Sequence, residues 1–317
     1  MGWQVIGHEW AERLLTGHLA RGEVRHAYLL TGPSGVGRRT LALRFAQALN
    51  CLEPPAPGEY CGRCRICRQT AAMQHSDLEI IQAEKEGGVL KVEQVRDLQR
   101  SLSLLPYEAR YRVALLLRFE EANPSAQNAL LKTLEEAPQR VVLLLTADSA
   151  ENLLPTIVSR CEVLRLRPMP LDRLQSCLEA QGLNRSDAHL LAHLSGGRLG
   201  YALRLKDDAG RMEHRRSVLE DLLQLLSEPR RVRFSYAEQA SRDKETLRET
   251  FSVWLSFWRD LMLRSAGTLE DASLPLVNVD LQAEIDRLAA HVDLPTARKC
   301  TADLERGIAR LDANLNP

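Results

Sequence analysis

Short apolar runs alternate with amphipathic segments from the start of the chain to about residue 166. The runs at 112–117 (RVALLL) and 140–146 (RVVLLLT) are apolar on both faces, as buried parallel strands tend to be. The segments 8–21, 92–102 and 125–136 carry apolar residues at helical spacing. Further strands are predicted at 26–31, 77–82 and 161–166. Because strands that alternate with helices form parallel sheets, this part is predicted to be an α/β domain.

The pattern changes at Pro168 and Pro170, which we interpret as a linker. Residues 171–205 have the periodicity of three short helices, and the chain after Gly210 is helical in pattern throughout. One strong apolar stripe there is typical of a bundle core: Phe251, Trp254, Leu255, Trp258, Leu261 and Met262. The pattern predicts three domains, at 1–166, 167–207 and 208–317.

Composition excludes several classes of protein. The 317 residues include 42 Lys+Arg and 42 Asp+Glu, so the formal net charge is zero and a strongly basic nucleic-acid binder is not expected. The run at 229–233 (PRRVR) is interpreted as a solvated loop. No apolar run approaches the roughly 18 residues of a membrane helix, and the N-terminus lacks the pattern of a secretory signal. We expect a cytoplasmic protein.

A glycine-rich turn follows the strand predicted at 26–31 and precedes a helix. In that context, backbone N–H groups and the helix dipole bind phosphate. The phosphate-loop pattern is G-x-x-x-x-G-K-[ST], and Gly32, Gly35 and Gly37 fit it. Arg38 stands at the lysine position and Arg39 at the magnesium-binding hydroxyl position. Gly32, Gly35, Gly37 and Arg38 are therefore the candidate cofactor-binding residues. A turn without any ligand is the alternative, and residual nucleotide affinity stays open.

The acidic partner of such a loop is also missing. A second strand of a phosphate-loop ATPase ends in Asp-Glu, which orient Mg²⁺ and activate water. Here the strand at 112–117 runs into Arg118 and Phe119. Glu120 and Glu121 follow, and we interpret them as solvated charges at a helix start. Since nothing at either position holds magnesium, no ATP hydrolysis is expected.

Four of the seven cysteines are clustered: Cys51, Cys61, Cys64 and Cys67. Two C-x2-C spacings in a reducing compartment indicate a metal site, and four thiolates suit tetrahedral zinc. The site is closed, so we expect a structural zinc module over 51–67. Nearby arginines are expected to offset its negative charge: Arg63, Arg65 and Arg68. Disulfides and an iron–sulfur cluster are the alternatives.

Several motifs together resemble bacterial AAA+ clamp-loader subunits. Residues 128–138 (NALLKTLEEAP) are similar to the box after the second nucleotide motif, and Ser159-Arg160-Cys161 to the SRC motif. The cysteine cluster matches the family's zinc module, and 309–317 resembles its C-terminal stretch. The resemblance is dense over 5–165 and weak beyond about 205. It implies an α/β AAA+ P-loop domain with a parallel sheet, then a small helical lid domain and an all-α C-terminal collar domain.

The departures from the nucleotide motifs favour the delta-prime branch of this family over the ATP-hydrolysing gamma/tau branch. Gamma/tau keeps a lid arginine at the position that falls on Gly200 here. The resemblance implies a pentameric hetero-oligomer with gamma/tau and delta subunits, which loads the sliding clamp on primer–template DNA. Zinc is the implied cofactor. An ATP-hydrolysing gamma/tau-like subunit and a zinc scaffold unrelated to replication are the alternatives.

Arg160 is the residue to which the resemblance gives a catalytic role. It implies an arginine finger that acts in trans on ATP held by a neighbouring subunit. A guanidinium suits that role because it is planar, permanently charged and able to donate two hydrogen bonds to phosphate. A simple salt bridge before the strand at 161–166 is the alternative.

Overall fold

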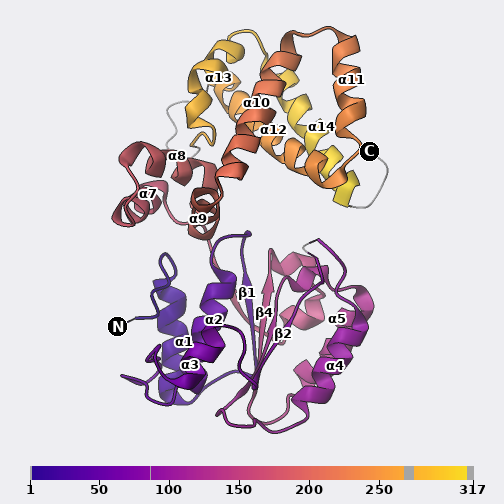
Figure 1. Ribbon diagram of the computed structural model, residues 1–317. Helices are drawn as coiled ribbons and strands as arrows, with labels where there is room; N and C mark the ends of the chain where they lie inside the picture. The colour runs from indigo at the N-terminus through magenta and orange to yellow at the C-terminus, as the bar shows by residue number, and fades with distance from the viewer. Residues whose placement is uncertain (1, 86, 268–274, 313–317) are drawn as a thin grey trace. The chain divides into compact units, whose positions relative to one another are not determined.

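The computed structural model describes residues 2–85, 87–267 and 275–312, and it divides into two compact units, Met1–Met169 and Pro170–Pro317 (Figure 1). The division falls within the proline-containing segment that the sequence marks as a linker. Among the described residues, no helix has both the length and the apolar character needed to cross a membrane.

The first unit is built on a five-stranded sheet in the order β2-β3-β4-β1-β5. Every neighbouring pair is parallel, which confirms the predicted parallel sheet. The strands are β1 (Ala27–Thr31), β2 (Leu78–Ile81), β3 (Arg112–Leu116), β4 (Val141–Ala147) and β5 (Glu162–Arg165). The helices are α1 (Glu9–Arg21), α2 (Arg38–Asn50), α3 (Arg65–Ala71), α4 (Val92–Leu102), α5 (Pro124–Glu135) and α6 (Pro155–Val158), with short 3-10 turns η1 (Phe119–Glu121) and η2 (Ala150–Asn152).

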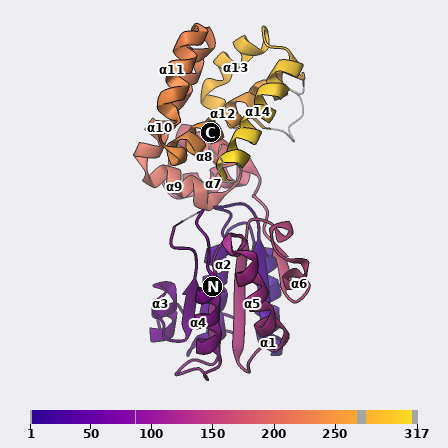
Figure 2. The ribbon, with the colours of Figure 1, turned by 90° about the vertical axis from the view of Figure 1, so that its right-hand side faces the viewer.

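Both faces of the sheet are buried, because successive side chains of a strand point to opposite sides. In β1, Ala27 and Leu29 pack in one apolar cluster with α4, α5 and α6. Tyr28 and Leu30 pack in the other cluster with α1 and α2. Figures 1 and 2 show the sheet between these two helical layers. The continuous apolar runs in the sequence therefore reflect a sheet that is covered on both faces.

The second unit is entirely helical in its described part. Its helices are α7 (Leu171–Ala180), α8 (Arg185–Ser195), α9 (Leu199–Asp207), α10 (Ala209–Ser227), α11 (Arg230–Ala240), α12 (Lys244–Ser265), α13 (Gln282–Ala289) and α14 (Leu294–Asp312), with a 3-10 turn η3 (Val279–Leu281). Phe257, Trp258 and Leu261 of α12 are buried in a core that α10, α13 and α14 complete. The apolar stripe predicted for a bundle core thus lies in one.

Two local predictions need correction. Helix α3 was not expected within the cysteine cluster; Cys64 caps it by accepting a hydrogen bond from the Cys67 N–H. The run 229–233 is not a loop, because residues 230–233 form the first turn of α11. Pro229 precedes that turn, where its missing N–H costs no helical hydrogen bond. The run is exposed as predicted. Residues 313–317 of the family-like C-terminal stretch lie outside the described residues.

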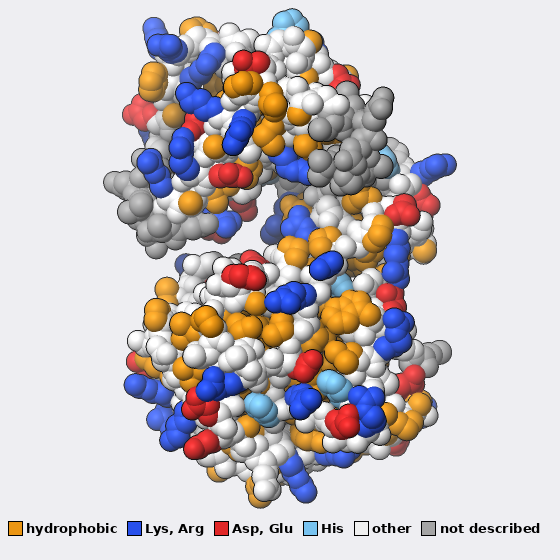
Figure 3. All heavy atoms as spheres, turned by 180° about the vertical axis from the view of Figure 1, so that it is seen from behind, with side chains coloured by type: hydrophobic (Ala, Val, Ile, Leu, Met, Phe, Trp, Pro, Cys, Tyr) orange, Lys and Arg blue, Asp and Glu red, His pale blue; other side chains and the backbone are white. Residues whose placement is uncertain are grey.

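Surface charge follows the balanced composition. On the first unit, Figure 3 shows basic and acidic side chains interspersed over the face in view. This face therefore has no extended field of one sign of the kind that captures nucleic acid by charge alone.

Candidate functional site

The glycine-rich turn joins β1 to α2 in a backbone conformation that needs glycine. Gly32, Gly35 and Gly37 have φ values of 142°, 83° and 115°. A Cβ atom at residue 32 would lie 2.3 Å from the Leu166 carbonyl oxygen, so no side chain fits there. The buried His8 ring donates a hydrogen bond from Nε2 to the Val36 carbonyl oxygen at 2.8 Å. The loop is thus held by close packing against the Leu166 backbone and by the hydrogen bond from His8.

Arg38, the first residue of α2, does not point into solvent. Its side chain is only 8% exposed, and its Nη2 lies 2.6 Å from Oδ1 of Asp148. Its Nη1 lies 4.0 Å from Oε1 of Glu120. All three residues follow the carboxyl ends of parallel strands, β1, β4 and β3, which are neighbours in the sheet. The guanidinium is therefore already paired with carboxylates at the mouth of its own loop.

The interpretation of Glu120 and Glu121 as solvated charges is wrong. The side chain of Glu120 is 17% exposed and that of Glu121 is 10% exposed. Burial raises the pKa of Glu120, and the nearby Asp148 carboxylate raises it further, against the opposing charge of Arg38. Glu121 accepts a hydrogen bond from Arg118 Nε at 2.8 Å. The η1 turn brings both carboxylates onto the sheet edge, which the sequence pattern alone did not reveal.

Arg160 lies at the opposite edge of the sheet, because it precedes β5 instead of following a strand. Its Nη2 lies 2.7 Å from Glu135 Oε1, at the end of α5, and its Nη1 donates to the Thr156 carbonyl oxygen at 2.9 Å. Its side chain keeps 34% of its surface exposed. The salt bridge that the sequence left as the alternative is present, and it holds a guanidinium that solvent still reaches.

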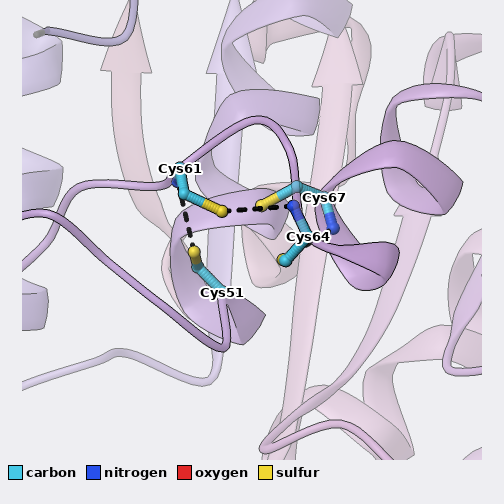
Figure 4. A group of neighbouring side chains, drawn as sticks. All are labelled: Cys51, Cys61, Cys64 and Cys67. Atoms are coloured by element: carbon cyan, nitrogen blue, oxygen red, sulfur yellow. Dashed lines mark hydrogen bonds between the residues drawn. The ribbon is translucent and has the colours of Figure 1, made fainter.

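The four clustered cysteines converge at the end of α2 and the start of α3 (Figure 4). Their Sγ atoms all lie within 4.8 Å of one another. Four sulfurs at 2.3 Å from a tetrahedral zinc would be about 3.8 Å apart, so a small contraction closes the site. Backbone N–H groups of Cys61, Cys64 and Cys67 each donate to the sulfur of another cysteine in the group.

The protonation chemistry of the cluster also fits a metal. Burial raises the pKa of Cys61, but hydrogen bonds with the N–H groups of Cys64 and Arg63 and with the side chains of Cys51 and Cys64 together lower it to about 6. Burial raises the pKa values of Cys51 and Cys67. Because metal ligation requires thiolates and thiolates this close repel one another, a cation bound between the four sulfurs would balance their charge. All four are free cysteines, so the structure does not pair them as disulfides.

Two of the arginines near the cluster form ion pairs with carboxylates. Arg63 Nη2 lies 3.8 Å from Glu53 Oε2, and the Arg65 guanidinium pairs with the Glu108 carboxylate. The expected compensation of the cluster's charge is therefore shared with carboxylates.

The lid position Gly200 lies in the first turn of α9. Arg198, two residues before it, donates from Nε to the Ser195 carbonyl oxygen at 2.7 Å. Its guanidinium also lies 4.6 Å from the centre of the Tyr201 ring. Arg198, the arginine nearest in sequence to the lid position, thus contacts residues of its own unit.

Sequence reasoning missed three residues of these sites: His8, Glu135 and Asp148. Asp148 carried a usable signal, because it directly follows a predicted buried strand and so lies at the same sheet edge as the loop after β1. His8 and Glu135 had no such signal, since their contacts depend on how helices pack.

A family model and the sequence relatives place the chain among DNA polymerase III subunits. A family model described as DNA polymerase III, delta subunit, matches residues 7–170. DNA polymerase III subunit delta' of Pseudomonas aeruginosa is 37% identical over 224 residues, which cover 70% of this chain and 67% of the relative. DNA polymerase III subunit tau of Escherichia coli is 35% identical over 211 residues, which cover 65% of this chain and 32% of that protein. A gamma subunit-related protein of Thermotoga maritima has 18% identity and a TM-score of 0.44 over 96% of this chain and 99% of that one.

Proposed function

The chain belongs to the DNA polymerase III delta-subunit family, and from this membership we propose that it is the delta-prime subunit of the clamp loader. In this role it hydrolyses no ATP. It completes the nucleotide site of a neighbouring gamma/tau subunit and thereby helps to load the sliding clamp on primed DNA.

The observation that carries the proposal is the ion pair of Arg38. A phosphate-loop ATPase needs a free cation at this position to contact the β- and γ-phosphates. Here the cation is 2.6 Å from Asp148, and a triphosphate would have to displace that carboxylate. Glu120 adds a second acidic group at the same edge. An incoming triphosphate thus meets carboxylates where an active subunit presents a free positive charge.

The two positions that hold magnesium in an active ATPase support the same conclusion. Arg39, at the hydroxyl position, is exposed and donates to Met73 Sδ. β3 is followed by Arg118, whose Nε contacts Glu121. Without magnesium to bridge the phosphates, charge that develops during hydrolysis is not neutralised. Nucleotide binding through Gly32, Gly35, Gly37 and Arg38 is therefore weak or absent.

The position of Arg160 supports action on another subunit. In the parallel pair of β1 and β5, Thr31 is level with Arg165, so the loop after β1 and the arginine before β5 lie at opposite sheet edges. The four residues of β5, Glu162–Arg165, lie between the two positions and span about 13 Å at roughly 3.3 Å per residue. Arg160 is thus out of reach of its own loop, while its exposed guanidinium is open to a neighbour's γ-phosphate.

Zinc in the Cys51, Cys61, Cys64 and Cys67 cluster has a structural role in this proposal. When bound, it supplies a cross-link between the end of α2 and the start of α3. Gln47 of α2 already donates to the Cys67 carbonyl oxygen at 2.7 Å. The four sulfurs leave no open position for a substrate, so no chemistry occurs at the ion.

In this proposal, the helical unit joins the chain to the other subunits. Residues 167–207 form the lid domain and residues 208–317 the collar, which joins delta, gamma/tau and this chain in a five-membered ring. DNA and the sliding clamp contact the assembly as a whole. The interspersed charges on the face of the first unit that Figure 3 shows support this indirect role. We also propose that the protein acts in the cytoplasm.

A gamma/tau-like ATPase is the second candidate, because the tau relative is nearly as similar in sequence as the delta-prime relative. Steady-state hydrolysis and calorimetric ATP binding by the isolated chain with Mg²⁺ separate the two. We expect no turnover from the wild-type chain or from Arg38→Ala. Turnover that Arg38→Ala abolishes would establish the ATPase and refute the delta-prime proposal.

A further inference from the structure

Two histidines lie one turn apart on α8, in the helical unit and outside every site described above. His189 and His193 have ring centroids 4.5 Å apart, with the ring planes inclined by 55°. His189 is exposed and His193 is half-buried. Residues at i and i+4 share one face of a helix, and paired histidines at this spacing are a recurring metal-ligand arrangement.

A backbone carbonyl fixes the proton of His193. Its Nδ1 lies 2.6 Å from the Leu276 carbonyl oxygen. Because a carbonyl oxygen only accepts hydrogen bonds, Nδ1 must carry the proton. In the neutral ring, Nε2 then holds the lone pair.

A side-chain relay fixes the proton of His189 in the same way. Gln175 Nε2 donates to Oε1 of Glu179 at 2.8 Å, so the amide oxygen of Gln175 faces the other way. That oxygen, Oε1, lies 3.2 Å from His189 Nδ1, which therefore donates to it. The lone pair of His189 is again on Nε2. Burial, together with the charges of His193 and Arg185, lowers the pKa of His189 and favours this neutral form.

We propose that His189 and His193 together bind a divalent transition-metal ion through their Nε2 atoms. Metal-binding histidines usually donate their other ring N–H to a carbonyl or carboxylate, which holds the ring and raises the basicity of the ligand nitrogen. Leu276 and the Gln175–Glu179 pair supply that outer support for both rings. Imidazole pairs suit zinc, nickel or copper, and water fills the remaining positions of this open site.

The site is independent of the cysteine cluster, since it lies in the other unit. Because His193 also contacts Leu276, a bound ion stabilises the contact between α8 and the segment before η3. We therefore expect the metal to raise the thermal stability of the protein, by an amount that grows with the logarithm of the metal concentration above the dissociation constant.

The test is a Ni²⁺ titration by calorimetry on full-length protein whose cysteine site is already loaded with zinc. The variants are His189→Asn and His193→Asn, because the Asn amide N–H replaces the Nδ1 donor while Nε2 is lost. His291→Asn is the matched control, since His291 also donates from Nδ1 to a backbone carbonyl, that of Arg287, at 3.0 Å. We expect one nickel ion for the wild type and the control, and an affinity about tenfold or more weaker for either variant.

Equal nickel affinity in wild type, His189→Asn and His193→Asn would overturn the proposal, and so would an equal loss in the His291→Asn control. His189 is exposed, so His189→Asn decides the question even if His193→Asn unfolds. Gln175→Leu provides a second readout: it leaves both ligand nitrogens in place and is expected to weaken nickel binding about tenfold by releasing His189. An unchanged affinity in Gln175→Leu contradicts the role assigned to the relay.

Discussion

Two arginines show how the same side chain serves different purposes at opposite edges of one sheet. Arg38 is nearly buried against Asp148, while Arg160 is one-third exposed and braced by Glu135. Both guanidinium groups carry a permanent charge. The first neutralises carboxylates within its own unit. The second is oriented by one carboxylate and one backbone carbonyl and remains accessible, as the proposed action on another subunit requires.

Removal of the Arg38 side chain is predicted to destabilise the first unit. Arg38→Ala leaves Glu120 and Asp148 facing each other without a counter-charge. We expect a loss of about 1–3 kcal/mol in the free energy of unfolding, below the 3–5 kcal/mol of a fully buried pair because Asp148 is half exposed. Chemical denaturation measures it. Arg39→Ala, at an exposed position, is the control and should change stability by less than about 0.5 kcal/mol.

Glu120 provides a pH-dependent prediction. Its folded-state pKa is raised above 4.5 by burial, so between 4.5 and the raised value the unfolded chain releases a proton that the folded chain retains. Wild-type stability therefore falls as pH rises through that window. Glu120→Gln lacks this loss and should unfold at a higher denaturant concentration than wild type at pH 7, with the difference disappearing below pH 4.5. A difference that stays constant across this range contradicts the account, and Glu151→Gln at an exposed position serves as control.

At the scale of elements, the buried strands were predictable and the contacts between their ends were not. The runs that form β3 and β4 are apolar on both faces, and this pattern is expected of strands in a sheet that is covered on both sides. The strand order placed β4 between β1 and β3, and that order brought Asp148 and Glu120 to Arg38. No local pattern encodes strand order. The short helix α3 was equally hard to predict, because its first three residues lie within the cysteine cluster and include Cys67.

The zinc module gives a prediction for an element. Cys61→Ser removes one of the four sulfurs, and the variant is expected to purify with close to zero zinc where we expect one ion in the wild type. Since metal binding contributes directly to folding of such a module, the melting temperature should fall as well. Metal analysis after purification without chelator measures the content. Cys177→Ser removes a cysteine of α7 and should leave zinc unchanged; a zinc-replete Cys61→Ser variant would rule out the four-cysteine site.

At the scale of the whole molecule, the sequence anticipated a mixed α/β unit and a helical remainder, since periodicity and the cysteine spacing were both strong. The family-like motifs fall in the first unit, where the family model also matches. In the helical unit, the proposed pairing with other chains could not be predicted from periodicity, because periodicity reports burial within the chain itself. The proposed assembly is therefore tested most directly through Arg160, whose proposed target lies on another subunit.

The most direct test is the DNA-dependent ATPase and clamp-loading rate of an assembly reconstituted with gamma/tau, delta and Arg160→Ala. A single arginine finger is worth about 10³–10⁵ in rate at its site. We predict that clamp loading slows about tenfold or more, that Arg160→Lys fails to restore it, and that Arg165→Ala, at an exposed position of β5, behaves as wild type. Unchanged ATPase and loading rates in an intact Arg160→Ala assembly would contradict the account.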